Sequence, residues 1–200
     1  MPILALVFAY LLGSIPFGYL LVKWRTGADV RTSGSGNIGA TNVLRTTGRA
    51  AAIATLALDI AKGYVAVWIA VSLTGANLWW TSAAALAVMA GHSYPVFLKF
   101  QGGKAVATFV GAFFCLTPLP MVAALAVFAG VTAWTRYVSL GSIAAAATFP
   151  LAVWLILQAS WPVLLASMAA GLFIIYKHSS NIARVREGKE HTLSLGTKRP

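Results

Sequence analysis

The sequence predicts an all-α integral membrane protein with seven transmembrane helices. Three observations support this. The chain is 59% hydrophobic and only 10% charged, whereas soluble domains carry about 25% charged residues. Its apolar residues form runs of roughly membrane length. Its cations, which give a net charge of +11, gather at the ends of those runs. Because 200 residues suffice for one compact bundle, we expect a single transmembrane domain, residues 1–200.

The apolar runs define the helices in chain order. The first run, residues 3–22, has no cation before it and Lys23 and Arg25 after it, the reverse of a signal peptide, so we expect a retained helix. The other expected spans cover residues 50–73, 78–97, 104–117, 121–135, 138–158 and 161–176, to within a few residues. The fourth span is short and is stopped by Thr117-Pro-Leu-Pro120, so a tilted or partly re-entrant element is the alternative there.

Charge asymmetry predicts the orientation. Every Lys and Arg except Lys62 lies in residues 23–49, 91–104 or 177–200, or is Arg136, while the turns at 74–77, 117–120 and 158–161 carry no charge. The positive-inside rule therefore places the N-terminus outside and the C-terminus in the cytoplasm. The same bias, with attraction to anionic membrane lipids, accounts for much of the net charge, so nucleic acid is not an expected partner.

The first cationic segment contains Ser33-Gly-Ser-Gly-Asn-Ile-Gly-Ala-Thr-Asn42. It matches the dinucleotide-binding pattern of glycines, but no βαβ unit surrounds it, so that interpretation is rejected. Glycines let backbone N–H groups converge on an anion, and a following Arg can bind phosphate through two hydrogen bonds. A plain flexible loop is the alternative. The candidate binding residues are Ser35, Gly36, Asn37, Gly39, Thr41, Asn42 and Arg45.

The second segment ends in Gln101-Gly-Gly-Lys104 and leads directly into a helix. The free N–H groups of a helix N-terminus, with the glycines and a Lys, predict an anion site formed by Gly102, Gly103 and Lys104. Ala105 stands where a Walker A motif needs Ser or Thr for Mg²⁺, so nucleotide hydrolysis is not expected. A membrane-flanking turn with an anchoring Lys is the alternative.

The remaining polar candidates lie near or inside the helices. His92 falls at the inner end of the third span. His178 and Asn181 would share a face at the end of the seventh span if its helix continued. Asp59 and Lys62, deep in the second span, have the spacing of an ion pair, with a structural role or a role in catalysis as alternatives. Three scattered His and one Cys give no metal-ligand spacing, so no metal is expected.

Together, Ser35–Asn42, Gly91-His with Gly102-Gly-Lys104, and His178, Asn181 and Glu190 resemble the bacterial acyl-phosphate-dependent glycerol-3-phosphate acyltransferase family over the whole chain. The resemblance implies a multi-pass enzyme of the bacterial inner (cell) membrane, with its active site at the cytoplasmic face. It would transfer an acyl group from acyl phosphate to the 1-hydroxyl of sn-glycerol 3-phosphate, giving lysophosphatidic acid for phospholipid synthesis without a cofactor.

The resemblance also implies residue roles. Ser35 and Arg45 would be essential, and the turn with Gly102, Gly103 and Lys104 would bind glycerol 3-phosphate. Ala105 departs from relatives that carry Gly there. Three routes for the hydroxyl proton stay open: His178 as base, the substrate's own phosphate, or an acyl-enzyme on Ser35. A transporter of organic anions is the rival function, but the chain lacks the internal repeats typical of transporters.

Overall fold

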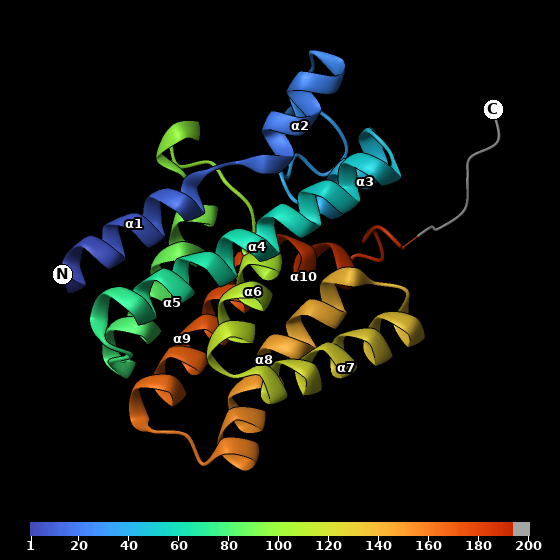
Figure 1. The fold of residues 1–200 in the computed structure, drawn as a ribbon. Helices are drawn as coiled ribbons and strands as arrows, with labels where there is room; N and C mark the ends of the chain where they lie inside the picture. Colours follow the sequence, from blue (N-terminus) through green and yellow to red (C-terminus); the bar gives the residue numbers. More distant parts are fainter. Residues whose placement is uncertain (194–200) are drawn as a thin grey trace.

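The structure is a computed structural model that describes residues 1–193, and every regular element in that range is helical (Figure 1). Two short 3₁₀ turns, η1 and η2, interrupt the α-helices. In chain order the elements are α1 (Pro2–Ser14), α2 (Phe17–Thr26), η1 (Val30–Thr32), α3 (Ala40–Thr46), α4 (Arg49–Thr74), α5 (Leu78–Ser93), η2 (Val96–Leu98), α6 (Val106–Leu116), α7 (Pro118–Thr135), α8 (Val138–Leu157), α9 (Trp161–Lys177) and α10 (Ser179–Arg186).

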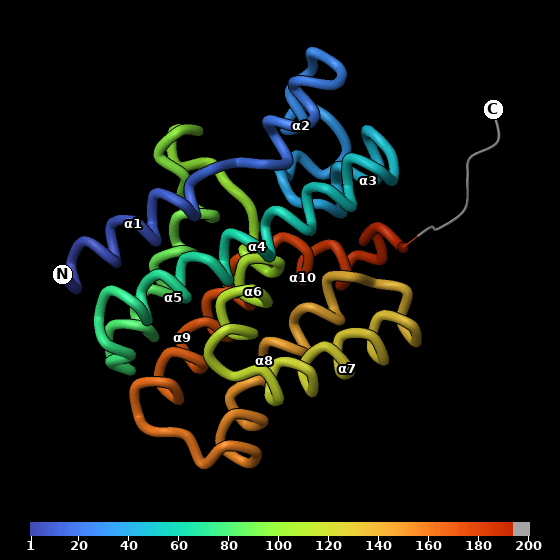
Figure 2. The backbone as a smooth tube through the Cα atoms, viewed as in Figure 1, coloured from blue at the N-terminus to red at the C-terminus, as the bar shows by residue number. Residues whose placement is uncertain are grey.

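The segments that carry the polar motifs gather at one end of the helix bundle. Helices α2, α3 and α10 lie there, whereas the N-terminus and the connection between α8 and α9 lie at the other end (Figure 1). The tube in Figure 2 follows the chain from α1 through a bend into α2, and from α3 directly into the long α4. The first and last polar segments, far apart in sequence, are thus brought to one end of the molecule.

The first expected span is broken, which corrects the expectation of one continuous helix over residues 3–22. Helix α1 ends at Ser14 and α2 begins at Phe17, because Pro16 has no N–H to continue the helical hydrogen bonds. At the break, the carbonyl of Ile15 accepts the N–H of Phe17 at 3.2 Å and the ammonium group of Lys62 at 2.9 Å. Polar backbone groups freed inside a membrane need such a partner.

Within the described residues, four segments are long and apolar enough to cross a membrane, and a fifth would be α9 with α10 if that pair, bent by 51°, is one span. The expected third span is shorter than predicted, because α5 has 16 residues and ends before Tyr94-Pro95. The expected fourth span is α6, with 11 residues. Helix α7 begins at Pro118, three residues earlier than expected, since Pro suits the first position of a helix. Seven spans therefore stay a prediction, while the all-helical, membrane-embedded class is confirmed.

Small residues allow the helix that follows the second polar segment to pack closely on α4. A Cβ atom at Gly111 would lie 1.9 Å from the carbonyl oxygen of Ile60, and one at Gly63 would lie 2.2 Å from that of Thr108. Such glycine contacts are typical of membrane helices, where packing replaces the hydrophobic effect between helices. A cluster of Phe109, Phe113 and Phe149, with ring centroids 5.0–5.2 Å apart, fixes α6 against α8.

Candidate active site

The first polar loop is organised around the side chain of Asn42, which is only 2% exposed. Its Oδ1 accepts the N–H of Ser35 at 2.8 Å. Its Nδ2 donates to the carbonyls of Val30, Ser33 and Asn37 at 3.2, 3.1 and 2.8 Å. Both amide hydrogens are therefore engaged inside the loop. The structure gives Asn42 a structural role and leaves it no free donor for the substrate contact that we predicted.

The glycines of this loop meet two different needs. Gly34 has a φ of +61°, which favours glycine, and a Cβ atom there would lie 2.2 Å from Oδ1 of Asn42. Gly39 precedes α3 and donates its N–H to Oδ1 of Asn37 at 2.8 Å, an Asx turn that leads into the helix. The loop is thus built by specific hydrogen bonds, which argues against a plain flexible loop.

The groups that this loop leaves available are its side chains. Ser35 and Arg45 are exposed, and Thr41 is half-buried on α3. Gly36, with a φ of +70°, turns the chain immediately after Ser35. The hydroxyl of Ser35 in the loop and the guanidinium of Arg45 on the following helix α3 therefore both lie at the surface, which suits contact with a ligand.

The glycine turn before α6 packs against His92. The N–H of Gly103 donates to the carbonyl of His92 at 3.1 Å, so this donor is not available to a substrate, which corrects our expectation. A Cβ atom at Gly102 would lie 2.2 Å from the same carbonyl oxygen. Ala105 adopts a left-handed conformation with a φ of +59° and is completely buried. The N–H groups of the first turn of α6 remain donors for an anion.

Lys104 and the third polar segment meet through Asn181. The ammonium group of Lys104 donates to Oδ1 of Asn181, and Nδ2 of Asn181 donates to Oε1 of Glu190 at 2.7 Å. The hydroxyl of Ser139, at the start of α8, donates to the same oxygen at 2.8 Å, and Nε of Arg184 donates to Oε2 at 2.8 Å. Glu190 is the centre of this cluster, and Asn181 connects it to Lys104.

The cluster is strongly cationic. Arg45, Lys104 and Arg184 lie close enough to influence one another's titration, with Glu190 as the carboxylate among them. Burial, together with the positive charge of Arg184, lowers the pKa of Lys104 to about 8. Burial would raise the pKa of Glu190, but hydrogen bonds from Asn181, Ser139 and Arg184 outweigh it and hold that pKa below its ordinary value. The arrangement suits a phosphate-bearing ligand.

His178 lies at a break between helices, so the continuous helix that would have put it on one face with Asn181 is not formed. Helix α9 ends at Lys177, and α10 begins at Ser179 after a bend of 51°. The His178 side chain turns back, and its Nδ1 lies 2.8 Å from the carbonyl oxygen of Ile174. Burial lowers the pKa of His178 to about 4, so the ring is neutral at pH 7 with Nε2 as its acceptor.

The predicted pair of Asp59 and Lys62 is confirmed. Nζ of Lys62 lies 2.8 Å from Oδ1 of Asp59, and Nδ1 of His92 lies 3.6 Å from the same oxygen. All three side chains are buried. His92 therefore stands between this pair and the glycine turn, rather than in the cluster around Lys104.

Sequence reasoning missed three residues at this end of the molecule. Arg184 lies three residues after Asn181 in the same cationic segment, and that helical spacing could have identified it. Lys177, whose Nζ lies 4.5 Å from the ring centroid of Tyr94, adds a further cation near Lys104. Nothing in the sequence distinguished Ser139 from other small polar residues at helix ends.

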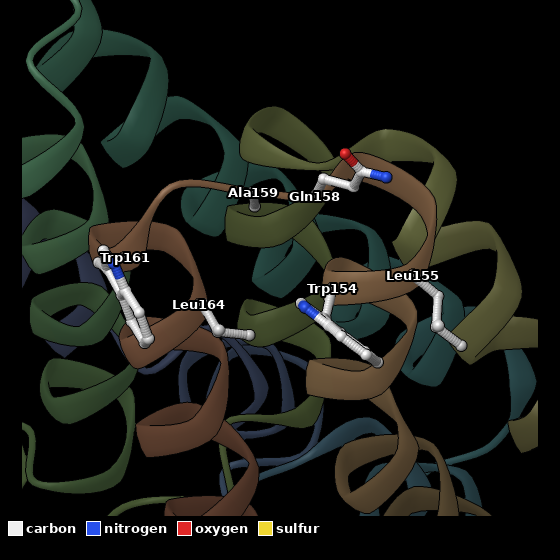
Figure 3. Close-up of a pocket in the computed structure, with 6 residues that line it drawn as sticks. All are labelled: Trp154, Leu155, Gln158, Ala159, Trp161 and Leu164. Atoms are coloured by element: carbon white, nitrogen blue, oxygen red, sulfur yellow. The ribbon is translucent and has the colours of Figure 1, made fainter.

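The structure contains a hollow of about 520 Å³ away from the cationic cluster (Figure 3). It lies at the connection between α8 and α9, at the other end of the bundle. Its lining, with no charged side chain, consists of Trp154, Leu155, Gln158, Ala159, Trp161 and Leu164. Within residues 1–193, no group of three His, Cys, Asp or Glu side chains could hold a metal ion.

This chain is similar to known proteins in both sequence and fold. The family model of glycerol-3-phosphate acyltransferase matches residues 3–188. Glycerol-3-phosphate acyltransferases of Geobacter sulfurreducens and Geotalea daltonii are 49% and 48% identical to this chain, covering 92% and 94% of it and 93% and 96% of their own lengths.

Two crystal structures of PlsY, an integral membrane glycerol 3-phosphate acyltransferase, superpose closely. The glycerol 3-phosphate form gives a TM-score of 0.92 at 40% identity and covers 96% of both chains. The lysophosphatidic acid form gives 0.89 at 38% identity, covering 96% of this chain and 95% of the other. The chain therefore belongs to the glycerol-3-phosphate acyltransferase family.

Proposed function

We propose that the protein transfers an acyl group from acyl phosphate to the 1-hydroxyl of sn-glycerol 3-phosphate, giving lysophosphatidic acid and phosphate. The observation that carries the proposal is the cluster around Lys104, where cations from three separate segments surround one carboxylate. Both substrates carry phosphate, so the reaction needs cationic groups for two anions. The related PlsY structures in glycerol 3-phosphate and lysophosphatidic acid forms support the acceptor and the product.

The proposed reaction develops negative charge at two places in turn. The hydroxyl oxygen of glycerol 3-phosphate attacks the acyl carbonyl carbon and forms the ester bond. The bond between that carbon and the phosphate oxygen breaks, and phosphate leaves with the electron pair. Negative charge grows first on the carbonyl oxygen and then on the leaving phosphate. Donors fixed beforehand at those places stabilise the transition state.

We assign glycerol 3-phosphate to Lys104, Asn181 and the first turn of α6. Asn181 holds the ammonium group of Lys104, while Lys104 sits at the helix end where free N–H groups favour an anion. We assign the phosphate of the donor to the first loop, where Ser35 and Arg45 are exposed. The acyl chain would lie among the apolar helices. Gly36, Asn37, Gly39, Thr41 and Asn42 shape or line that loop.

Two routes for the hydroxyl proton fit the geometry of His178 and of the substrate. Nε2 of His178 is a free acceptor on a neutral ring, because Nδ1 faces a carbonyl. A pKa of about 4 makes that nitrogen a weak base. The substrate's own phosphate, with a second pKa of about 6 by analogy with phosphorylated side chains, is the stronger base. We therefore favour the substrate phosphate. An acyl-enzyme on Ser35 is the third route, and we favour it least, because the exposed Ser35 hydroxyl would need a base to activate it.

The proposal includes a location. We propose that the enzyme lies in the bacterial inner membrane with this cluster at the cytoplasmic face. The charge asymmetry supports it, since Lys104, Arg45 and the C-terminal cations all lie on the side that the positive-inside rule assigns to the cytoplasm.

The test is synthesis by purified protein in detergent, without vesicles. Acyl phosphate and glycerol 3-phosphate are supplied, and lysophosphatidic acid is measured by mass spectrometry. We expect product with acyl phosphate and none when acyl coenzyme A replaces it, while the Arg45→Ala variant serves as the matched inactive control. Product from the thioester would contradict the proposed donor. Absence of product with either donor would contradict the acyltransferase proposal and favour transport of organic anions.

A further inference from the structure

We infer that His92 is a positioning residue for the glycine turn before Lys104, and that the buried pair of Asp59 and Lys62 holds its ring in place. The inference rests on the proposed function, because the turn presents Lys104 to glycerol 3-phosphate. His92 itself does not belong to the cluster around Lys104. It acts through Gly103, against which its ring and its carbonyl both pack.

The pair of Asp59 and Lys62 is held in place by contacts that do not involve His92. Asp59 and Lys62 are 2% and 3% exposed, and ionisable groups at such depth in a membrane protein need partners. Lys62 has two: Oδ1 of Asp59 at 2.8 Å and the carbonyl of Ile15 at 2.9 Å. The second contact ties the ammonium group to the break between α1 and α2. Asp59 is therefore held in one place by a cation that cannot move freely.

Asp59 in turn orients the ring of His92, which is 4% exposed. Oδ1 of Asp59 lies 3.6 Å from Nδ1 of His92, too long for a hydrogen bond, but at this distance the charge of the carboxylate favours the tautomer with its proton on Nδ1. The ring then presents Nε2, which carries no proton, on its opposite side. That side faces the glycine turn.

The turn fits around this ring with no spare space. A Cβ atom at Gly103 would lie 2.2 Å from Nε2 of His92, and the three nearest atoms all belong to the ring. The carbonyl of the same residue accepts the N–H of Gly103 at 3.1 Å. The next residue is Lys104. A change in the position of the ring would therefore move Gly103 and, through it, the ammonium group of Lys104 that we propose binds glycerol 3-phosphate.

The first experiment measures glycerol 3-phosphate binding and turnover separately. We expect His92→Ala to weaken binding of glycerol 3-phosphate, measured by calorimetry in detergent, by roughly 10- to 100-fold, about the loss of one hydrogen bond to a charged group. KM for glycerol 3-phosphate should rise in parallel, with little change in KM for acyl phosphate. Asp59→Asn, which keeps the shape but removes the charge, should change the same constants in the same direction.

The matched control is Ser82→Ala. Ser82 is a buried polar residue on the same helix, α5, ten residues before His92, and it should leave both KM values unchanged. A folded His92→Ala protein that binds glycerol 3-phosphate as the wild type does would overturn the inference. An equal rise in both KM values would also overturn it, because it would indicate a general loss of structure.

A second pair of variants distinguishes a specific loss of binding from a loss of folding. Gly103→Ala alone should bind glycerol 3-phosphate poorly, because the new methyl group meets the ring. In the double variant with His92→Ala, the ring is gone and the methyl group has space, so binding should improve over Gly103→Ala alone. A double variant that binds no better contradicts the inference. Failure of the proposed function is recognised separately, as a wild-type protein that makes no lysophosphatidic acid, since calorimetry does not depend on turnover.

Discussion

Lys104 should make the affinity for glycerol 3-phosphate fall as the pH rises through 8. Burial lowers the pKa of Lys104 from 10.5 to about 8, so the protein holds a charged ammonium group at neutral pH at a cost of about 3 kcal/mol. Binding of the phosphate of glycerol 3-phosphate beside Lys104 would stabilise this charged form. The sign follows: the cation that binds phosphate is present below pH 8 and is lost above it.

The magnitude follows from the titration curve. With a pKa of about 8, roughly nine-tenths of the Lys104 groups are protonated at pH 7 and roughly one-tenth at pH 9. KM for glycerol 3-phosphate should therefore rise about tenfold across that interval. In Lys104→Arg the guanidinium stays protonated over the whole range, so this rise should disappear even if the affinity at pH 7 is lower.

The assay is initial-rate kinetics between pH 6.5 and 9.5, with acyl phosphate saturating and lysophosphatidic acid as the measured product. Reserve aliquots returned to pH 7 provide the control for irreversible loss of the protein. A KM that stays flat to pH 9.5 in the wild type would refute the titration of Lys104. A rise that persists unchanged in Lys104→Arg would assign the titration to another group.

Four further outcomes are expected. Arg45→Ala should lower kcat/KM by roughly 30- to 1,000-fold, the loss of one charge-assisted contact of about 2–4 kcal/mol, and Arg45→Lys should restore little; normal turnover of folded Arg45→Ala would disprove the role. Glu190→Ala should lower the melting temperature, because three donors lose their acceptor. Since the pKa of Glu190 is lowered, its contribution to the wild type should be present above about pH 4.5 and fade below it, and an acid melting profile shared by both proteins would refute this. His178→Ala should keep any rise in rate between pH 6 and 7, because His178 is already neutral there; loss of that rise would identify it as the base. A cysteine replacing Asn77 should react with an impermeant reagent from outside the cell, and reaction from the cytoplasm alone would reverse the orientation.

The sequence was sufficient to predict the all-helical membrane class of the fold and to propose the segments of the candidate site, because hydropathy and charge indicate both. Length and apolar composition place helices in a membrane, and the concentration of cations at their ends identified Arg45 and Lys104. The pairing of Asp59 with Lys62 followed from their depth and spacing. These are properties of single segments, which a sequence displays directly.

Features that depend on contacts between segments could not be predicted in the same way. The carbonyl of Ile15, at the break after Ser14, accepts a hydrogen bond from Lys62 of another helix. The sequence predicts Asn42 as a ligand-binding donor, whereas in the structure its amide is hydrogen-bonded within the loop. The N–H of Gly103 likewise belongs to His92. In each case the sequence displays the polar group, whereas tertiary packing decides its partner.

The two anion sites that we propose should differ in what their cations do for catalysis. The phosphate of glycerol 3-phosphate gains no negative charge in the reaction, and loses some when it takes the hydroxyl proton, so a cation beside it contributes to substrate binding and no more to the transition state. The phosphate of the donor gains charge as its bond to carbon breaks, so a cation there is more effective in the transition state. Loss of Lys104 should therefore raise KM for glycerol 3-phosphate, whereas loss of Arg45 should lower kcat. A Lys104→Met variant with reduced kcat and an unchanged KM would place Lys104 at the leaving phosphate and exchange the two sites.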